Sequence, residues 1–494
     1  MTMSRAFSRL PASPGSRAPR WAGIALCCAL LGACAVGPDY QRPAIDVGAA
    51  YKEGQGQVPG WTPAQPRDTA DRGAWWQVYG DATLDGLMER LNASNLSVAQ
   101  AEANYRQAQA LVQGARAGFF PVVGANAGAT RSGAGSRAGA TGVTNQYSLG
   151  GTVSWEADLW GRVRRDVEAS RAEAEASLAD LAGTRLSAQA ALTQNYFQLR
   201  VLDEQKRLLE TTVATYERSL QLTQNRYQAG VAGKSDVSVA LAQLEGARAQ
   251  LVDLEWQRGQ FEHAIAVLVG LAPSRFTLPP EPFGQQLPQI PVGMPSQLLE
   301  RRPDVAAAER RAAAANAQIG VATAAWFPDL VLSADGGFRS GQFAQWLTAP
   351  ARYWSLGPAL ALTLFDGGAR QAQIDQARAA YDAQAAAYRQ TVLGALQEVE
   401  DYLIQLRVLE QEQVVQQRAL EAARESLRLA RNQYQAGLIG YLDVAVLETT
   451  ALNSERTALT LLGNRLTASV QLIAALGGGW QGVGAELAER TSGQ

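Results

Sequence analysis

The chain carries two hydrophobic patterns, one typical of long helices and one typical of strands. In two stretches, 162–229 and 369–436, there is no proline, and apolar residues recur every three or four positions. Each stretch predicts a single helix of about 70 residues, which would extend about 100 Å and is too long for a compact domain. A glycine-containing turn and a return helix follow each stretch, at 230–236 with 237–269 and at 437–443 with 444–475.

A two-residue alternation, typical of strands, precedes each long helix. Between 147 and 159 the odd positions are apolar or glycine, among them Trp155, and the even positions are mostly polar. The stretch 354–364 repeats this pattern. Alternating runs of about ten residues suit transmembrane strands. We therefore expect membrane hairpins at 120–159 and 329–366, with a soluble, half-buried hairpin as the alternative.

The chain is internally duplicated. Shifted by 207 residues, the distance from Val98 to Val305, much of the sequence falls on itself. The matching blocks include Phe120-Pro121 with Phe327-Pro328, 198–202 with 405–409, and 227–230 with 434–437. A period this long indicates a duplicated structural unit rather than a solenoid. We therefore expect two repeats, 96–271 and 304–475, each with a first helix, a hairpin, a long helix, a tip turn and a return helix.

The N-terminus predicts export and lipid attachment. Four arginines precede an apolar run at 21–31 that is about half as long as a membrane-spanning helix. Leu31-Gly32-Ala33-Cys34 resembles the lipobox of bacterial lipoproteins. We therefore expect a signal peptide over 1–33 and a mature chain whose first residue, Cys34, carries covalent lipid such as palmitate. A secreted protein with a chance cysteine is the alternative.

Charge and side-chain chemistry exclude several functions. Removal of the signal peptide takes away four of the 44 basic residues and none of the 46 acidic ones, so the mature chain has a net charge of 40 minus 46, or −6. It has no basic cluster that could bind nucleic acid. The chain has one histidine, His263, and its three cysteines all lie within the first 34 residues. We expect no enzyme activity, no metal site and no cofactor other than the lipid on Cys34.

Four membrane strands per chain cannot form a closed structure by themselves. An open sheet edge does not persist in lipid, and the smallest common membrane barrels have about eight strands. Several copies of the chain must therefore share one barrel. This argument leaves the number of copies open.

Four sequence blocks, in order along the chain, resemble the TolC-like outer-membrane factors. The closest resemblance is to the lipoprotein branch that serves resistance-nodulation-division (RND) efflux pumps, the NodT-type lipoproteins. The blocks are 34–43 at the acylated start, 75–84 with its paired tryptophans, 294–304 with its Arg-Arg-Pro-Asp ending, and 434–443 at the second helix tip. Together with the duplication, they cover nearly the whole mature chain.

The resemblance implies a membrane α+β fold. The expected assembly is a homotrimer with a 12-stranded outer-membrane β-barrel, four strands from each chain, continued by a long periplasmic α-helical barrel. The resemblance also implies an equatorial belt built from the segments outside the repeats, 34–95, the proline-rich 272–303 and the tail 476–494.

The implied function is the outer-membrane channel of a tripartite efflux system. The channel would passively conduct drugs or other small molecules delivered by a periplasmic adaptor (membrane-fusion) protein and an inner-membrane RND transporter. Two alternatives remain, the outer-membrane duct of a type I protein secretion system and a non-conducting coiled-coil lipoprotein.

The resemblance also points to a gate at the periplasmic helix tips. Asp443 and Tyr434 match gate positions of the second repeat, and Asp236 and Ser235 match the corresponding turn of the first. In a trimer, Asp443 would form a ring of three carboxylates that favours cations. Helix capping is the alternative role for both aspartates. Because Val446 stands where the family often has a second acid, we expect a more apolar gate.

The same turns are expected to bind the adaptor, since they form the ends of the predicted pairs of long and return helices. Glycines permit tight turns there. The expected docking residues are Gly230, Gly233, Lys234, Gly437, Gly440 and Tyr441.

Overall fold

A computed structural model describes residues 35–48, 50–53, 73–133, 142–284 and 301–478. The expected signal peptide, Cys34, positions 285–300 of the proline-rich linker and the tail after 478 lie outside the described residues. In the described part, no helix is both long and apolar enough to cross a membrane.

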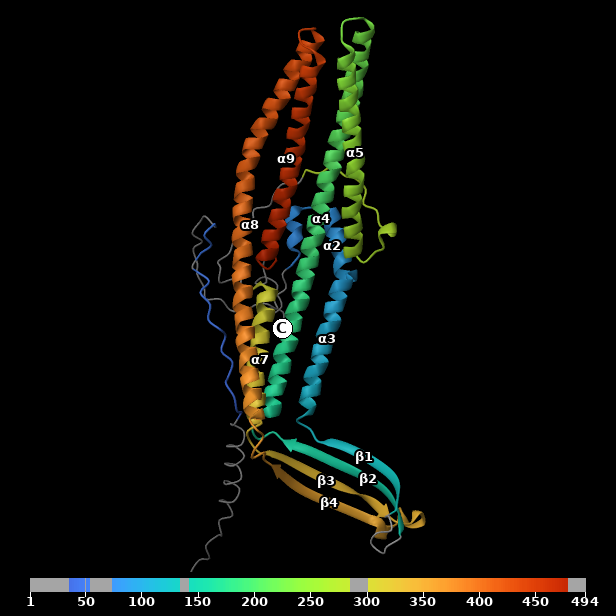
Figure 1. The fold of residues 1–494 in the computed structure, drawn as a ribbon, viewed down its shortest axis with the longest axis vertical. Coiled ribbons are helices and arrows are strands. Elements are labelled where there is room, and N and C mark those ends of the chain that lie inside the picture. The colour runs from blue at the N-terminus through green and yellow to red at the C-terminus, as the bar shows by residue number, and fades with distance from the viewer. Residues whose placement is uncertain (1–34, 49, 54–72, 134–141, 285–300, 479–494) are drawn as a thin grey trace, which may run out of the picture. The chain divides into compact units, whose positions relative to one another are not determined.

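The helices follow the duplication seen in the sequence. Their bounds are α2 (Ala82–Ser94), α3 (Leu96–Ala117), α4 (Arg162–Gln228), α5 (Lys234–Leu268), α7 (Pro303–Ala324), α8 (Ala369–Gln435) and α9 (Tyr441–Ala475). The long helices α4 and α8 have 67 residues each, and the return helices α5 and α9 have 35 each. Figure 1 shows α5 returning beside α4, and α9 beside α8. The return helices begin three residues earlier than expected, so the tip turns are shorter than 230–236 and 437–443.

The described chain divides into two compact units that cut across both repeats. One unit takes in residues up to Gln41 with Ala110–Ala172 and Ala313–Ala383, and contains the sheet. The other takes in Arg42–Gln109, Glu173–Ala312 and the chain from Gln384 onward, and contains the helix tips. Neither unit corresponds to one repeat, because each is built from both copies.

The sheet has four antiparallel strands in sequence order. They are β1 (Val122–Gly133), β2 (Val143–Ala157), β3 (Asp329–Ser340) and β4 (Arg352–Ala361). The β2–β3 pairing joins the two repeats, with Leu149 opposite Phe338. β1 and β4 are the outer strands, and each pairs on one side only within the described residues. The alternation expected as far as 364 outlasts the strand, which ends at Ala361.

The register gives the sheet one apolar and one polar face. Rungs such as Val123–Val153–Ala334–Leu356 lie on one face, and rungs such as Gly124–Thr152–Asp335–Ser355 lie on the other. Several large side chains of the apolar face are exposed, including Trp354, Leu356 and Leu360. A soluble sheet with one such face would normally cover it with other elements.

Glycines occupy the centre of the polar face. Gly150 lies opposite Gly337, which in turn lies opposite Tyr353. A Cβ on Gly337 would come within 2.1 Å of the Leu149 carbonyl oxygen, so a side chain does not fit there. The Tyr353 hydroxyl donates to Asp335 at 3.3 Å, and the Arg339 guanidinium lies 4.5 Å from the tyrosine ring centroid.

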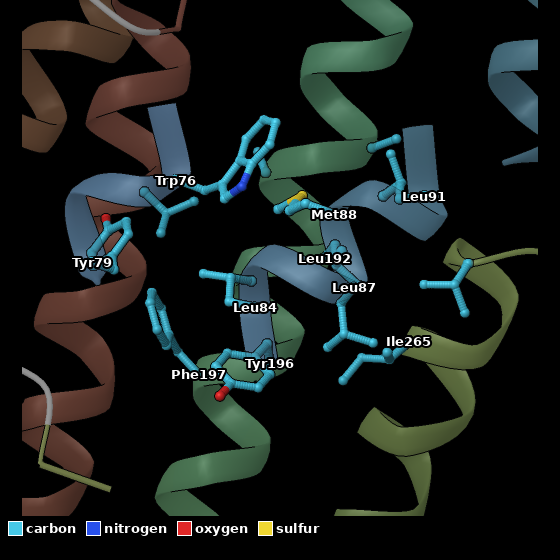
Figure 2. Close-up of a cluster of buried hydrophobic side chains, with 14 of the residues drawn as sticks. Trp76, Tyr79, Leu84, Leu87, Met88, Leu91, Leu192, Tyr196, Phe197 and Ile265 are labelled. Atoms are coloured by element: carbon cyan, nitrogen blue, oxygen red, sulfur yellow. The ribbon is translucent and has the colours of Figure 1, made fainter. Parts of the chain in front are cut away.

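The largest hydrophobic core lies in the second unit and packs its helices together. A short 3-10 helix, η1 (Trp75–Tyr79), and α2 insert their apolar side chains between α4, α5 and α9. Figure 2 shows Leu84, Met88 and Leu192 among the side chains of this cluster. Asp81 accepts hydrogen bonds from the first-turn amides of α2, at Thr83 and Leu84, and so begins that helix. The paired tryptophans of the 75–84 block are therefore core residues.

Candidate functional site

The helix tips end in matching glycine turns. Gly230 and Gly437 both have φ of 77°, in the left-handed region. Beyond them, the Val231 amide donates to the Arg226 carbonyl and the Leu438 amide donates to the Gln433 carbonyl, both at 2.9 Å. This is the Schellman arrangement, which satisfies carbonyls that a helix end leaves free. The duplicated sequence therefore makes the same backbone turn twice.

Tyr434 lies buried beneath the second tip and joins α8 to α4. Its hydroxyl is 3.1 Å from the Thr223 hydroxyl. Arg226 of α4 donates to the Tyr434 carbonyl oxygen at 2.7 Å, and its guanidinium lies 4.6 Å from the centroid of the Tyr434 ring. The tyrosine thus holds the long helices of both repeats together just behind the turn.

A second cluster adds the return helices. Tyr441 is 1% exposed, packs edge-on against Tyr434 with 5.6 Å between ring centroids, and donates to Gln243 of α5 at 3.0 Å. Its hydroxyl also lies 3.3 Å from a carboxylate oxygen of Glu448. Gln243 in turn donates to the Ala445 carbonyl of α9 at 2.6 Å. All four helices of the tip region are therefore linked by hydrogen bonds.

An ion pair lies inside this cluster. Glu448 is 3% exposed, and its carboxylate accepts a hydrogen bond from Arg431 of α8 at 2.9 Å. Burial raises the pKa of Glu448, while the arginine acts in the opposite direction. Burial and the nearby Glu448 charge also raise the pKa of Tyr441, and the same causes raise the pKa of Tyr216 to about 12. Both tyrosines therefore stay protonated and can donate hydrogen bonds.

The four predicted gate residues are not gathered in one place. Tyr434 lies inside the buried cluster, whereas Asp443 and Ser235 are exposed and Asp236 is half-buried. Both aspartates lie in the first turn of a return helix, where a negative charge is favourable. The N-cap residues are glycines without a side-chain cap, so neither aspartate is the N-cap that the capping alternative supposed.

The predicted docking residues divide in a similar way. The side chain of Lys234 and the glycine backbones at 230, 233, 437 and 440 are exposed. Tyr441 is buried between the helices, so in this arrangement its side chain is not part of the exposed surface of the tip.

Sequence reasoning missed the charged partners of the tip. The expectation of a more apolar tip overlooked the Arg431–Glu448 pair and the Arg226 contacts. One signal was available in the duplication. At the same 207-residue offset, Arg431 and Glu448 correspond to Gln224 and Leu241 of the first repeat, so only the second copy carries the pair.

In the described residues, no group of three or more His, Cys, Asp or Glu side chains is arranged to hold a metal ion. The tip cluster is composed of hydrogen-bonding and ion-pairing groups that tie helices together. Its contacts link α4, α5, α8 and α9 near their tips.

Comparisons with known proteins give one consistent picture. The sequence profile of the outer membrane efflux protein family matches residues 87–271 and 294–478. The probable efflux pump outer membrane protein TtgC of Pseudomonas putida is 32% identical, with 92% of this chain and 95% of the relative covered. The outer membrane protein OprJ of Pseudomonas aeruginosa is 33% identical, with 94% of this chain and 97% of the relative covered.

Solved structures agree with these relatives. The structure of the outer-membrane channel OprN matches with a TM-score of 0.81 and 34% identity, covering 91% of this chain and all of that one. The structure of CusC matches with a TM-score of 0.80 and 25% identity, covering 90% and 100%.

Proposed function

The chain belongs to the outer membrane efflux protein family, and from that premise we propose that it forms, as a homotrimer, the channel of a tripartite efflux system. The channel reaches from the outer membrane into the periplasm and passively conducts drugs or other small molecules. Its partners are a periplasmic adaptor protein and an inner-membrane RND transporter, which supplies the energy.

The observation that carries this proposal is the two-faced sheet with unpaired outer edges. Its apolar face suits lipid and its polar face suits a water-filled lumen. β1 and β4 need partners in a membrane, since free edges are costly in lipid. Three copies supply 12 strands, which is enough to close a barrel around a lumen.

The duplication predicts how neighbouring chains pair. In one chain, Leu149 of the first repeat lies opposite Phe338 of the second. Shifting each residue by 207 positions places Leu356 opposite Arg131 of the partner subunit. If the trimer repeats its internal geometry, this pairing continues the sheet with the apolar residues of β4 on the same face as before.

The helix tips form the gate of the proposed channel. The clusters around Tyr434 and Glu448 hold the two helix pairs together behind this gate. Asp443, exposed at the start of α9, becomes a ring of three carboxylates under threefold symmetry. Asp236 and Ser235 take the corresponding places on the first tip. The exposed glycine turns and Lys234 serve as the docking surface of the adaptor.

Lipid on Cys34 anchors the mature chain to the outer membrane. The support is the sequence at 31–34 alone. Replacement of Cys34 by Ser would abolish incorporation of labelled palmitate. Incorporation that persists in this variant would place the lipid elsewhere.

The decisive experiment is accumulation of a fluorescent drug in a strain that lacks this gene and expresses the cognate adaptor and transporter. The wild-type gene should restore low accumulation. Export of a protein substrate in place of the drug would favour the type I secretion duct. Purified protein without conductance in planar bilayers would favour the non-conducting lipoprotein.

A further inference from the structure

The two faces of the sheet carry different charged residues. The acidic residues of the four strands, Glu156, Asp329 and Asp335, all lie on the polar face. The charged residues that the strands place on the apolar face are both arginines, Arg131 of β1 and Arg352 of β4. An arginine on a lipid-facing strand is strongly destabilising at mid-membrane but costs little near the headgroups.

Both arginines lie at the same end of the sheet. Arg131 is close to the end of β1 and Arg352 is the first residue of β4. The opposite end is where β1 begins after α3 and where β2 leads into α4. If the long helices are periplasmic, the two arginines mark the rim on the outer leaflet.

The same rim carries aromatic side chains. The ring of Tyr147 on β2 lies 5.4 Å from Phe343 and 6.3 Å from Trp346, measured between centroids. Aromatic residues gather where a membrane protein meets the lipid headgroups. In the proposed barrel, the arginines would therefore lie at headgroup depth rather than among acyl chains.

Both guanidinium groups are available. Arg131 and Arg352 are exposed, and neither makes an ion pair with another described residue. The Arg352 guanidinium lies 5.9 Å from the Phe338 ring centroid. This contact does not use the N–H donors of the guanidinium as hydrogen bonds to described residues.

We propose that Arg131 and Arg352 bind the phosphate groups of the outer-leaflet glycolipid at the rim of the barrel. A guanidinium matches phosphate with two parallel charge-assisted hydrogen bonds, and the neighbouring apolar face accommodates the acyl chains. The inference rests on the proposed function, which makes this face the one in contact with lipid.

The predicted seam, in which β4 of one chain pairs with β1 of the next, brings the two arginines together. Leu356 would lie opposite Arg131 of the partner subunit, and Arg352 lies four residues along the same strand. At 3.3 Å per residue this is a separation of about 13 Å along the seam. Two extended arginine side chains can both reach a headgroup that carries two phosphates, so a trimer offers three equivalent sites.

The test uses the purified full chain in nanodiscs of phosphatidylcholine doped with bisphosphorylated lipid A. Native mass spectrometry counts the lipid A retained by the wild type, by the double variant Arg131→Gln/Arg352→Gln, and by the double lysine variant. Arg339→Gln, which removes an arginine from the polar face, is the matched control. Further arms use dephosphorylated lipid A and an excess of inorganic phosphate.

We expect the double glutamine variant to lose at least tenfold in lipid A retention, since charge-assisted hydrogen bonds are lost. The lysine variant should retain part of the binding, and Arg339→Gln should match the wild type. Unchanged retention in the glutamine variant overturns the proposal. Equal retention of dephosphorylated lipid, or complete displacement by inorganic phosphate, also overturns it.

A separate readout distinguishes this inference from the proposed function. Trp354, which is 82% exposed on the apolar face, should be quenched by brominated phosphatidylcholine, measured as the difference from Trp354→Phe. If Trp354 is quenched and the channel conducts normally, but the double glutamine variant retains as much lipid A as the wild type, the lipid site alone is refuted. Absence of quenching would mean that this face does not contact lipid, and both proposals would fail.

Discussion

Arg431 donates a hydrogen bond to Glu448 at 2.9 Å, although the glutamate side chain is 1% exposed and the arginine side chain is 40% exposed. The pair therefore joins a buried charge on α9 to a partner on α8 that still contacts solvent. Removing the partner leaves an uncompensated carboxylate in the tip, whereas removing the carboxylate leaves a charge that water can solvate.

The first prediction uses this asymmetry. Arg431→Met should destabilise the tip by about 2–4 kcal/mol, because Glu448 is left buried and unpaired. Glu448→Gln should cost less than about 1 kcal/mol, and the double variant should recover most of the Arg431→Met loss. The measurement is thermal unfolding followed by circular dichroism, with single-channel open probability as the functional readout. Additive effects of the two changes would show that the pair does not couple the helices.

The second prediction concerns pH. Because burial raises the pKa of Glu448, the folded tip holds this proton more tightly than the unfolded chain does. The resulting stabilisation is complete below the unfolded pKa of about 4.3 and is lost as pH rises through the raised folded pKa. Mild acid should therefore strengthen the tip at this residue, not open it.

The readout is the difference in melting temperature between wild type and Glu448→Gln across this pH range. The difference should move in favour of the wild type as pH falls. Glu455→Gln serves as the control. Glu455 lies on α9, like Glu448, and pairs with Arg424 of α8. A trend of the opposite sign would mean that the ion pair outweighs burial.

The third prediction separates the two tyrosines of the repeat. Tyr434→Phe removes the hydrogen bond to Thr223 and should raise the open probability modestly, because one hydrogen bond stabilises the folded tip by only about 1 kcal/mol. Tyr227→Phe, at the equivalent position of the first repeat, should have no effect because that side chain is 46% exposed. Equal effects in planar-bilayer recordings would argue against a special role for the second tip.

The fourth prediction tests the glycine rung of the sheet. Gly337→Ala should disrupt the β2–β3 pairing, since the added Cβ would lie 2.1 Å from the Leu149 carbonyl oxygen. Gly357→Ala, on the same face of β4 with open space around it, should assemble normally. The amount of heat-resistant trimer in outer-membrane fractions measures the effect. Normal assembly of Gly337→Ala would show that the register differs from the one described.

The fifth prediction concerns Asp443. In the trimer, Asp443→Ala should weaken cation preference, because three exposed carboxylates are lost near the narrow end. The reversal potential in a salt gradient reports the change. Asp236→Ala is the matched control from the first repeat, and a smaller shift is expected there. An unchanged reversal potential in Asp443→Ala would remove this residue from the conducting path.

Several parts of the fold were predictable because they depend on local sequence. The absence of proline and the three-and-four spacing predicted the long helices, and α4 and α8 begin at the expected residues. The two-residue alternation at 147–159 and 354–364 predicted the second strand of each hairpin. The sheet order was not accessible in the same way, since β2 pairs with β3 across a separation of more than 170 residues.

The candidate site shows the same division. Tyr434 was identified because its block resembles a known family, but Glu448 and Gln243 look like ordinary surface residues of helices when only the sequence is considered. Their burial depends on α5 and α9 packing together at the tip. A single helix pattern cannot report which polar side chains a neighbouring helix will cover.

By itself, the sequence determined the duplication, the lengths of the helices and the two-faced strands, because each follows from spacing along one segment. Only the tertiary structure decided that Arg431 and Glu448 meet, that Tyr441 is buried, and that the acids of the sheet all lie on one face while Arg131 and Arg352 lie on the other. The physical reason is that burial and ion pairing are properties of contacts between segments, and those contacts are set by packing across the whole chain.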